Sequence, residues 1–268
     1  MSNERQPYEL VERNLRSAMA FYAGSNEKGE TRTMAGVELV HCGWDYPVFN
    51  SALLSAPVAG VNGTLEARLA MASIYFRALG VGWSYWICHD LLDEATLRHM
   101  RDSCYTYRME PVITAPGMYV QELLPPKRRA LPLEVREVRD TSSRLAFAHL
   151  VSLIFDLPFQ MTADVYGREE GWTAEYAAFI GYVGDLAVTM AMVSVSEGCC
   201  GFYSVGTLPG HRRMGYAETV MREANRQLKE RQRLDSCVLQ SSTAGRRLYE
   251  QMGFREVTRF SVFRSAPG

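Results

Sequence analysis

The sequence predicts a mixed α/β fold of the α+β kind, in which a mostly antiparallel sheet is flanked by helices and two domains lie in tandem. Three observations predict this fold. The chain has 268 residues, more than the ~100–150 of a usual single domain. Runs with the alternating period of strands are joined by short turns, and runs with helical period follow them. A proline-rich stretch separates two such regions in the middle of the chain.

The first domain is expected at residues 1–124. Helices are predicted at 8–22, 64–79 and Leu91–Met100, and an aromatic strand at Trp83–Cys88. The third helix opens with Asp93 and Glu94, whose negative charge suits a helix amino terminus. The strand–helix–strand order at 83–114 repeats the order at 236–263, which indicates an internal duplication.

A linker is expected at residues 125–132. Three prolines surround the basic triplet Lys127, Arg128 and Arg129, and the apolar pattern begins anew after them. The second domain is therefore expected at residues 133–268.

The second domain has the clearer pattern. Strands are predicted at Leu133–Val138, Tyr176–Val183, Leu186–Val195, Cys199–Thr207, Ser236–Leu239 and Arg255–Phe263. The turn pairs Gly184-Asp185 and Glu197-Gly198 join the middle strands, which predicts an antiparallel meander. Helices are predicted after the N-cap Asp140, from Tyr216 onward, and from Thr243 to Met252.

The composition excludes several classes of protein. With 47% hydrophobic and 22% charged residues and a net charge of -1, the chain resembles a soluble globular protein and lacks the basic surplus of a dedicated nucleic-acid binder. The amino terminus has no apolar core of a signal peptide, and no window has the ~20 apolar residues of a membrane span. We expect a soluble, cytoplasmic protein with no nucleic-acid or membrane partner.

Six cysteines are spread along the chain without a CxxC pair. Adjacent potential ligands, as in His41-Cys42 and Cys88-His89, suit tetrahedral zinc poorly. We expect buried, reduced thiols and no metal site.

The segment Val205–Ala217 carries the strongest chemical signal. A strand ends, the chain turns at Pro209-Gly210, and an amphipathic helix opens near Gly215. The exposed N–H groups and partial positive charge of a helix amino terminus attract anions, and glycine lets a phosphate approach closely. The sequence lacks both G-x-x-x-x-G-K-[ST] and G-x-G-x-x-G, so neither common nucleotide loop is present.

Two motifs in this order resemble those of the GNAT superfamily of N-acetyltransferases. Arg212-x-x-Gly215-x-Ala217 resembles motif A, and the segment from Ser242 to Phe254, with Leu248-Tyr249 and Gly253-Phe254, resembles the second signature, N-x-x-A-x-x-L-Y-x-x-x-G-F. The order of elements from residue 133 to residue 263 is also similar to that fold. The resemblance covers half of the chain. The first half resembles a degenerate copy, as in tandem GNAT proteins, without motif A before its 64–79 helix, and we expect it not to bind coenzyme A in the same manner.

The resemblance implies acetyl-coenzyme A as cofactor and assigns roles by motif position. The N–H of Val205 would meet the thioester carbonyl, and Tyr249 would donate a proton to the departing thiolate. Ser242 stands where the family has asparagine. The remaining cofactor-binding residues would be Val205, Gly206 and Thr207 along the pantetheine arm and Arg212, Arg213, Met214, Gly215, Tyr216 and Ala217 around the pyrophosphate.

The general base is not identified from the sequence. Some family members carry a glutamate at the position of Gly201, and the polar candidates in this domain are Tyr203, Ser204, Asp185, Glu175 and His149. A water relay or a substrate that arrives as free amine are the alternatives. The acceptor pocket is expected where the domains meet.

The leading interpretation is an enzyme that moves an acetyl group to a primary amine by direct attack in a ternary complex. The alternative is a non-catalytic acyl-coenzyme A binding or sensing module. The sequence leaves open whether the amine belongs to a small molecule or a protein, and whether the chain is a monomer or a homodimer.

Overall fold

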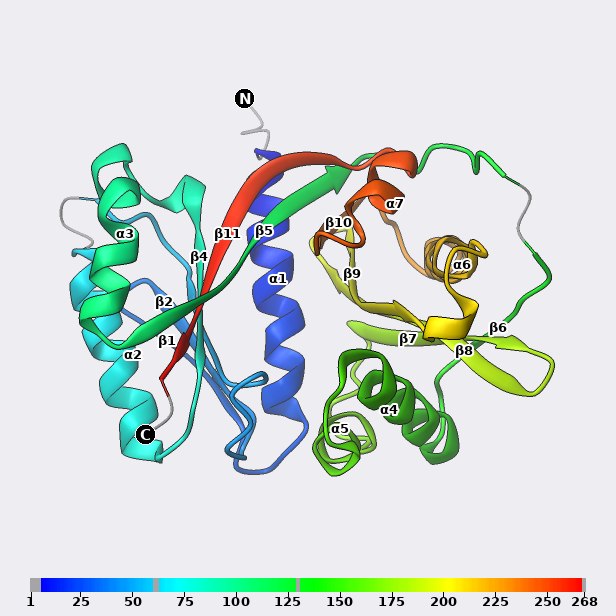
Figure 1. Cartoon of the computed structure of the whole chain (residues 1–268), viewed down its shortest axis with the longest axis horizontal. Coiled ribbons are helices and arrows are strands. Elements are labelled where there is room, and N and C mark those ends of the chain that lie inside the picture. Colours follow the sequence, from blue (N-terminus) through cyan, green and yellow to red (C-terminus); the bar gives the residue numbers. More distant parts are fainter. Residues whose placement is uncertain (1–5, 60–62, 129–130, 267–268) are drawn as a thin grey trace.

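The computed structural model describes residues 6–59, 63–128 and 131–266. In this part of the chain eleven strands form one sheet, in the order β1-β2-β3-β4-β11-β5-β10-β9-β8-β7-β6 (Figure 1). Neighbouring strands are antiparallel except for the pairs β3–β4 and β9–β10. The predicted fold, a mixed and mostly antiparallel sheet flanked by helices, is confirmed. The predicted linker residues 129 and 130 and the amino-terminal residues 1–5 lie outside the described residues.

The second half of the chain follows the predicted order of elements. Its elements are β6 (Glu134–Glu137), α4 (Thr141–Phe155), α5 (Phe159–Tyr166), β7 (Tyr176–Val183), β8 (Leu186–Ser196), β9 (Cys199–Thr207), the short 3₁₀ helix η3 (Pro209–His211), α6 (Tyr216–Lys229), β10 (Ser236–Gln240), α7 (Arg246–Gln251) and β11 (Arg255–Ser265). The N-cap Asp140 accepts a hydrogen bond from the N–H of Ser143 at 2.7 Å, as its position predicts. Glu197 and Gly198 both have positive φ, which suits the tight turn of the β8–β9 hairpin. The short helix α5 was not predicted.

The first half, from α1 onward, repeats the order that the second half has from α5 onward, and its described residues contain no counterpart of β6 and α4. Its elements are α1 (Pro7–Gly24), β1 (Glu30–Met34), β2 (Val37–His41), β3 (Ser51–Leu54), α2 (Leu65–Leu79), β4 (Ser84–Cys88), the 3₁₀ helix η2 (His89–Leu91), α3 (Glu94–Thr106) and β5 (Met109–Val120). The prediction of a helix over Leu91–Met100 was wrong in its limits. Asp93 caps the helix by accepting from the N–H of Thr96, so the helix begins at Glu94 and Leu91 belongs to η2. The predicted duplication corresponds to β4–α3–β5 and β10–α7–β11.

The two halves exchange their last strands. The carboxyl-terminal strand β11 lies between β4 and β5 of the first half, and β5 lies between β11 and β10 (Figure 1). The predicted boundary at residues 125–132 therefore divides the chain but not the sheet. Whether the parts 1–124 and 133–268 act as domains stays a prediction.

Helix α1 lies in the middle of the molecule, between the two groups of helices (Figure 1). Phe21 of α1 packs on Tyr166 of α5 with ring centroids 5.7 Å apart, and both side chains are buried. The aromatic core around them combines residues of both halves, including Phe49 and Phe147. All six cysteines are free and buried. Among the described residues, no helix is long and apolar enough to cross a membrane.

Candidate functional site

The predicted site around Val205 lies where β9 separates from its parallel neighbour β10. The two strands pair at three positions, the last of which joins Val238 to Gly201. Beyond this point residues 202–207 of β9 have no partner on the β10 side among the described strands. A strand edge carries free N–H and C=O groups, so this segment offers its backbone to a ligand.

A β-bulge interrupts β9 within this free segment. The register of β8 against β9 shifts between Met190 and Met192, and Ser204 and Val205 together stand opposite one residue of β8. Ser204 has a φ of 46°, a left-handed conformation that costs about 1 kcal/mol in a residue other than glycine. Bulges of this kind redirect backbone groups out of the ladder, and they are frequent beside active sites. The bulge lies at the residue predicted to meet the thioester.

The loop after β9 leads to the amino-terminal end of α6. Gly215, with a φ of 83°, is the N-cap of α6, and in the described part of the chain no side chain bonds to the N–H groups of the first turn. A Cβ built on Gly215 would meet no atom within 4 Å, so the space above the helix end is open. The predicted cradle, residues 213–217, therefore has free backbone donors at the positive end of a helix dipole. Arg212 instead braces the loop, because its Nε donates to the carbonyl of Thr207 at 3.0 Å.

The predicted site residues differ in exposure. Arg212, Arg213, Met214, Gly215 and Ser242 are exposed, Val205, Gly206 and Ala217 are half-buried, and Thr207, Tyr216 and Tyr249 are buried.

Tyr249, which the resemblance predicts to donate a proton to the departing thiolate, lies on α7. It is 8% exposed and packs edge-on against Phe254, and a Cβ on Gly245 would lie 2.7 Å from its ring. Desolvation raises the pKa of Tyr249 to about 12, so its phenol keeps its proton at neutral pH. The hydroxyl of Ser242 accepts from the N–H of Gly245 at 3.2 Å and still has its own proton to donate.

The position of the absent glutamate is filled from the other half of the chain. A Cβ on Gly201 would lie 1.7 Å from Oδ1 of Asn14, a residue of α1. The amide of Asn14 donates to Ser194 O at 3.1 Å and to the hydroxyl of Ser196 at 2.9 Å, and its Oδ1 accepts from the hydroxyl of Tyr203 at 2.8 Å. Asn14 is fully buried. Glycine at position 201 thus lets the helix of the first half lie directly on β9.

The candidate bases separate into two groups. Tyr203 and Ser204 lie on β9 at or beside the bulge, and desolvation raises the pKa of Tyr203 well above its usual value. Asp185 is exposed in the β7–β8 turn, Glu175 is exposed before β7, and His149 is exposed on α4 with its ring 5.4 Å from that of Phe159. The structure does not bring these three to the bulge.

Two tyrosines beside the bulge were missed by the sequence analysis. The hydroxyl of Tyr166, from α5, lies 3.4 Å from Oγ of Ser204 and donates to the hydroxyl of Tyr22, from α1, at 3.4 Å. Tyr166 is 1% exposed. No motif marks either residue, because they reach β9 from helices that are distant in sequence.

The equivalent place in the first half is closed. There β3 pairs with β4 at three positions, from Ser51 to Leu53, and beyond them Val58 still bridges to Leu92. The buried guanidinium of Arg68 donates to the carbonyls of Ala56 (2.5 Å) and Pro57 (2.7 Å), which precede α2. These contacts hold the segment after β3 against the end of β4. That the first half does not bind coenzyme A in the same manner stays a prediction.

Comparison with known proteins agrees with the observed fold. Residues 168–256 match the acetyltransferase (GNAT) domain. A GCN5-related N-acetyltransferase from Kribbella flavida is 16% identical over 95% of this chain and 96% of its own, with a TM-score of 0.71. One from Sphaerobacter thermophilus is 16% identical over 87% and 82%, with a TM-score of 0.59. A tandem GNAT protein from the clavulanic acid biosynthesis pathway is 11% identical over 97% and 96%, with a TM-score of 0.54. No curated protein matches the chain by sequence.

Proposed function

We propose that this chain, which carries a GNAT acetyltransferase domain at residues 168–256, is an N-acetyltransferase that moves an acetyl group from acetyl-coenzyme A to a primary amine. The GNAT fold itself implies acyl transfer from an acyl-coenzyme A. The observation that carries the finer proposal is the bulged segment of β9 beyond its pairing with β10, which the loop after Thr207 joins to the N-cap Gly215 of α6.

The backbone of this segment fits acetyl-coenzyme A. The free edge at Val205 to Thr207 would pair with the amides of the pantetheine arm, and the N–H groups of residues 213–217 would hold the pyrophosphate. Bound there, the cofactor supplies an activated thioester. Ser242 would donate its hydroxyl proton to the arm, since its oxygen is already used by Gly245.

The reaction would depend on two donors of this chain. The N–H of Val205, a residue of the bulge, would bond the carbonyl oxygen, where negative charge develops as the amine attacks. The hydroxyl of Tyr249 would give its proton to the leaving thiolate, since its raised pKa keeps the phenol neutral. Direct attack requires amine and thioester to be bound together, which makes the complex ternary.

The attacking amine must be neutral. Since Asn14 holds the space at Gly201, we propose that the amine binds as the free base or gives its proton to water. The hydroxyls of Ser204, Tyr166 and Tyr22 form a short chain from the bulge that would orient such a water.

The alternative, a non-catalytic acyl-coenzyme A binding or sensing module, is favoured by one observation. The side chain of Asn14, an amide that cannot take a proton from an amine, fills the space beside Gly201, where some family members carry a glutamate. Its hydrogen bonds also join α1 of the first half to β8 and β9 of the second half. Release of coenzyme A in the presence of any amine would exclude this alternative.

The first experiment is a calorimetric titration with acetyl-coenzyme A of the wild type and of Gly215→Glu, with Gly210→Glu as control. Both glycines are open to solvent, but only Gly215 is the N-cap of α6. Binding that is lost in Gly215→Glu and kept in Gly210→Glu supports the proposed cofactor site. If the folded wild type does not bind at about 1 mM ligand, the proposal is wrong. A panel of primary amines with a thiol assay then tests turnover.

A further inference from the structure

The gap that opens between β9 and β10 is flanked at its closed end by two polar side chains. The strands pair up to Gly201 of β9 and Val238 of β10. Side chains two positions apart on a strand point to the same face of the sheet, so Tyr203 and Gln240 follow this last pair on one face. They therefore stand on either side of the gap where it is narrowest.

Both side chains face helix α1 of the first half. The hydroxyl of Tyr203 donates to Oδ1 of Asn14 at 2.8 Å, and Nε2 of Gln240 donates to the carbonyl of Val11 at 3.4 Å. Val11 and Asn14 are fully buried. Helix α1 therefore covers this face of the gap and binds one side chain from each of its two strands.

The ring of Tyr203 lies close over its own strand. A Cβ on Gly201 would lie 2.8 Å from Cε2 of Tyr203, so the ring covers the closed end of the gap. Desolvation raises the pKa of Tyr203 well above its usual value, and a hydrogen bond with the side chain of Gln240 acts in the opposite direction. Gln240 thus reaches across the gap to the residue that stands opposite it.

The other face of the gap is closed by apolar side chains. Phe202 and Leu239 point to that face, because side chains alternate along a strand. Both are buried in one core with Tyr249. The gap is therefore bounded by buried apolar groups on one face and by Tyr203 and Gln240 on the other.

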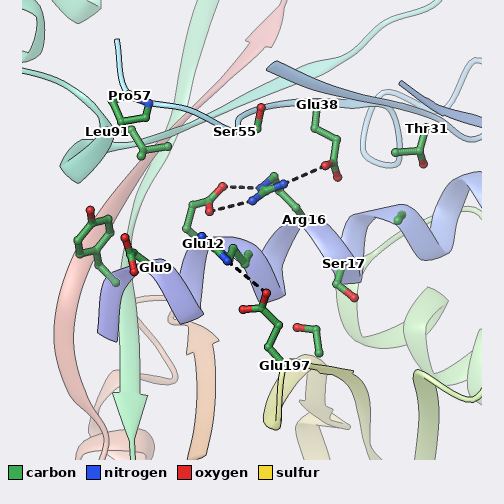
Figure 2. A pocket seen from close by; sticks show the side chains of 14 residues that line it. Glu9, Glu12, Arg16, Ser17, Thr31, Glu38, Ser55, Pro57, Leu91 and Glu197 are labelled. Atoms are coloured by element: carbon green, nitrogen blue, oxygen red, sulfur yellow. Dashed lines mark hydrogen bonds and ion pairs between the residues drawn. The ribbon is translucent and has the colours of Figure 1, made fainter. Parts of the chain in front are cut away.

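Helix α1 is anchored to both halves of the chain. Arg16 donates to Glu38 of β2 at 3.1 Å, and Arg13 donates to Glu197 of the β8–β9 turn at 3.2 Å (Figure 2). Asn14 adds its bonds to β8. The position of α1 over the gap is therefore fixed from both sides.

The proposed function directs the acyl group toward this place. The pyrophosphate would lie at residues 213–217 and the pantetheine arm along residues 205–207, so the thioester end of the cofactor points back along β9. Tyr203 precedes Val205, whose N–H would meet the thioester carbonyl, by two residues, which is at most about 7 Å of strand. The carbon chain on that carbonyl would therefore enter the gap in the direction of Tyr203 and Gln240.

We infer that Tyr203 and Gln240, held by helix α1, form the end wall of the acyl pocket and limit the transferred group to acetyl. This inference rests on the proposed function. An acetyl group ends before the end wall, whereas a longer chain has to displace a side chain that is bonded to α1. The first half of the chain thus selects the acyl group that the second half transfers.

The test is calorimetric titration of the full chain with coenzyme A and with its acetyl, propionyl, butyryl and hexanoyl thioesters. The measured quantity is the ratio of the dissociation constants of the butyryl and acetyl thioesters, because this ratio does not change when a variant weakens all ligands alike. Gln240→Ala and Tyr203→Leu each shorten one side chain of the end wall. Gln240→Met and Tyr203→Phe are the matched controls, which keep the bulk and lose the polar group. Circular dichroism checks that each variant folds.

We expect a ratio of about ten or more in the wild type, because a methylene group in excess of a fitted pocket weakens binding by about tenfold or more. The ratio should fall below about three in Gln240→Ala and Tyr203→Leu and stay at about ten or more in the two controls. Equal affinities of the wild type for the acetyl and butyryl thioesters would overturn the inference and leave the proposed function standing. Equal ratios in the shortened variants and their controls would do the same. If the folded wild type binds neither coenzyme A nor any thioester, the proposed function is wrong and the inference with it.

Discussion

The contact of Asn14 with Gly201 ties the two halves together, and its strength can be measured. In Gly201→Ala the new methyl carbon would lie 1.7 Å from Oδ1 and 2.6 Å from Cγ of Asn14, and both atoms belong to a buried side chain. Asn14 must therefore leave its place. Its departure breaks the bonds that its two amide protons make with Ser194, Ser196 and Cys199, and the bond from the hydroxyl of Tyr203. Three protons take part in these bonds, and at about 1 kcal/mol net for each proton we expect a loss of roughly 3 kcal/mol in the free energy of unfolding.

A double-mutant cycle separates this contact from other effects. Asn14→Ala alone should cost about 3 kcal/mol, since it removes the same bonds and leaves a space. In Asn14→Ala/Gly201→Ala the second methyl group enters that space, so the double variant should be more stable than the sum of the single losses predicts by about 2 kcal/mol. Gly210→Ala is the control, because a Cβ there meets no atom within 4 Å, and it should change stability by less than about 1 kcal/mol.

The assay is urea unfolding followed by tryptophan fluorescence and by far-ultraviolet circular dichroism. Coincident transitions are required before free energies are compared, because a chain of this size need not unfold in two states. Additive losses in the double variant would refute the reasoning, since they would mean that the two residues do not compete for one space. A neutral Gly201→Ala would refute it as well.

Three further predictions concern the acetyl-transfer site. Gly215→Glu should abolish binding of acetyl-coenzyme A, and Gly215→Ala should weaken it, which calorimetry measures. Because φ is 83° at this position, Gly215→Ala should also lower the free energy of unfolding by about 1 kcal/mol, which urea unfolding measures. Tyr249→Phe keeps the ring contacts with Gly245 and Phe254, so kcat should fall about 100-fold at unchanged KM and stability; an unchanged kcat in steady-state kinetics would assign the proton to another donor. The rate of acetyl transfer should rise with pH as the amine loses its proton. Ionisation of Tyr249 should not lower the rate below about pH 11, because the phenol keeps its proton up to its pKa of about 12. A descending limb near pH 9 in the pH–rate profile would contradict the role of Tyr249 as proton donor.

Much of the second half could be predicted because its signals are local. The alternation of apolar residues, the turn at Glu197-Gly198 and the cap at Asp140 each act within a few residues, and the strands and helices formed where these signals indicate. The loop from Thr207 to Gly215, where the sequence predicts a site for the pyrophosphate, also depends on such local signals. Its predicted chemistry uses backbone groups, which a glycine at the right spacing makes available, so the motif is visible in the sequence.

The parts that could not be predicted depend on contacts between distant residues. The strands β1 to β3 were not recognised, since β1 is largely exposed and β2 and β3 are short and buried along their whole length, so no alternation marks them. The exchange of β5 and β11 depends on which edge each strand finds, and both have the pattern of ordinary strands. Asn14, Tyr22 and Tyr166 reach β9 from α1 and α5, and nothing in their local sequence marks them.

The exchanged strands also bear on how the chain is made. A ribosome completes β4 roughly 180 residues before it completes β11, which at ~5–20 residues per second is about 10–35 s. During that interval the edge of β4 that β11 will cover is open, with the backbone groups of Ser84 to Cys88 free to pair with another chain. The nascent first half must therefore wait until β11 has been made before its sheet can close, and a chain truncated before β11 would leave both halves incomplete.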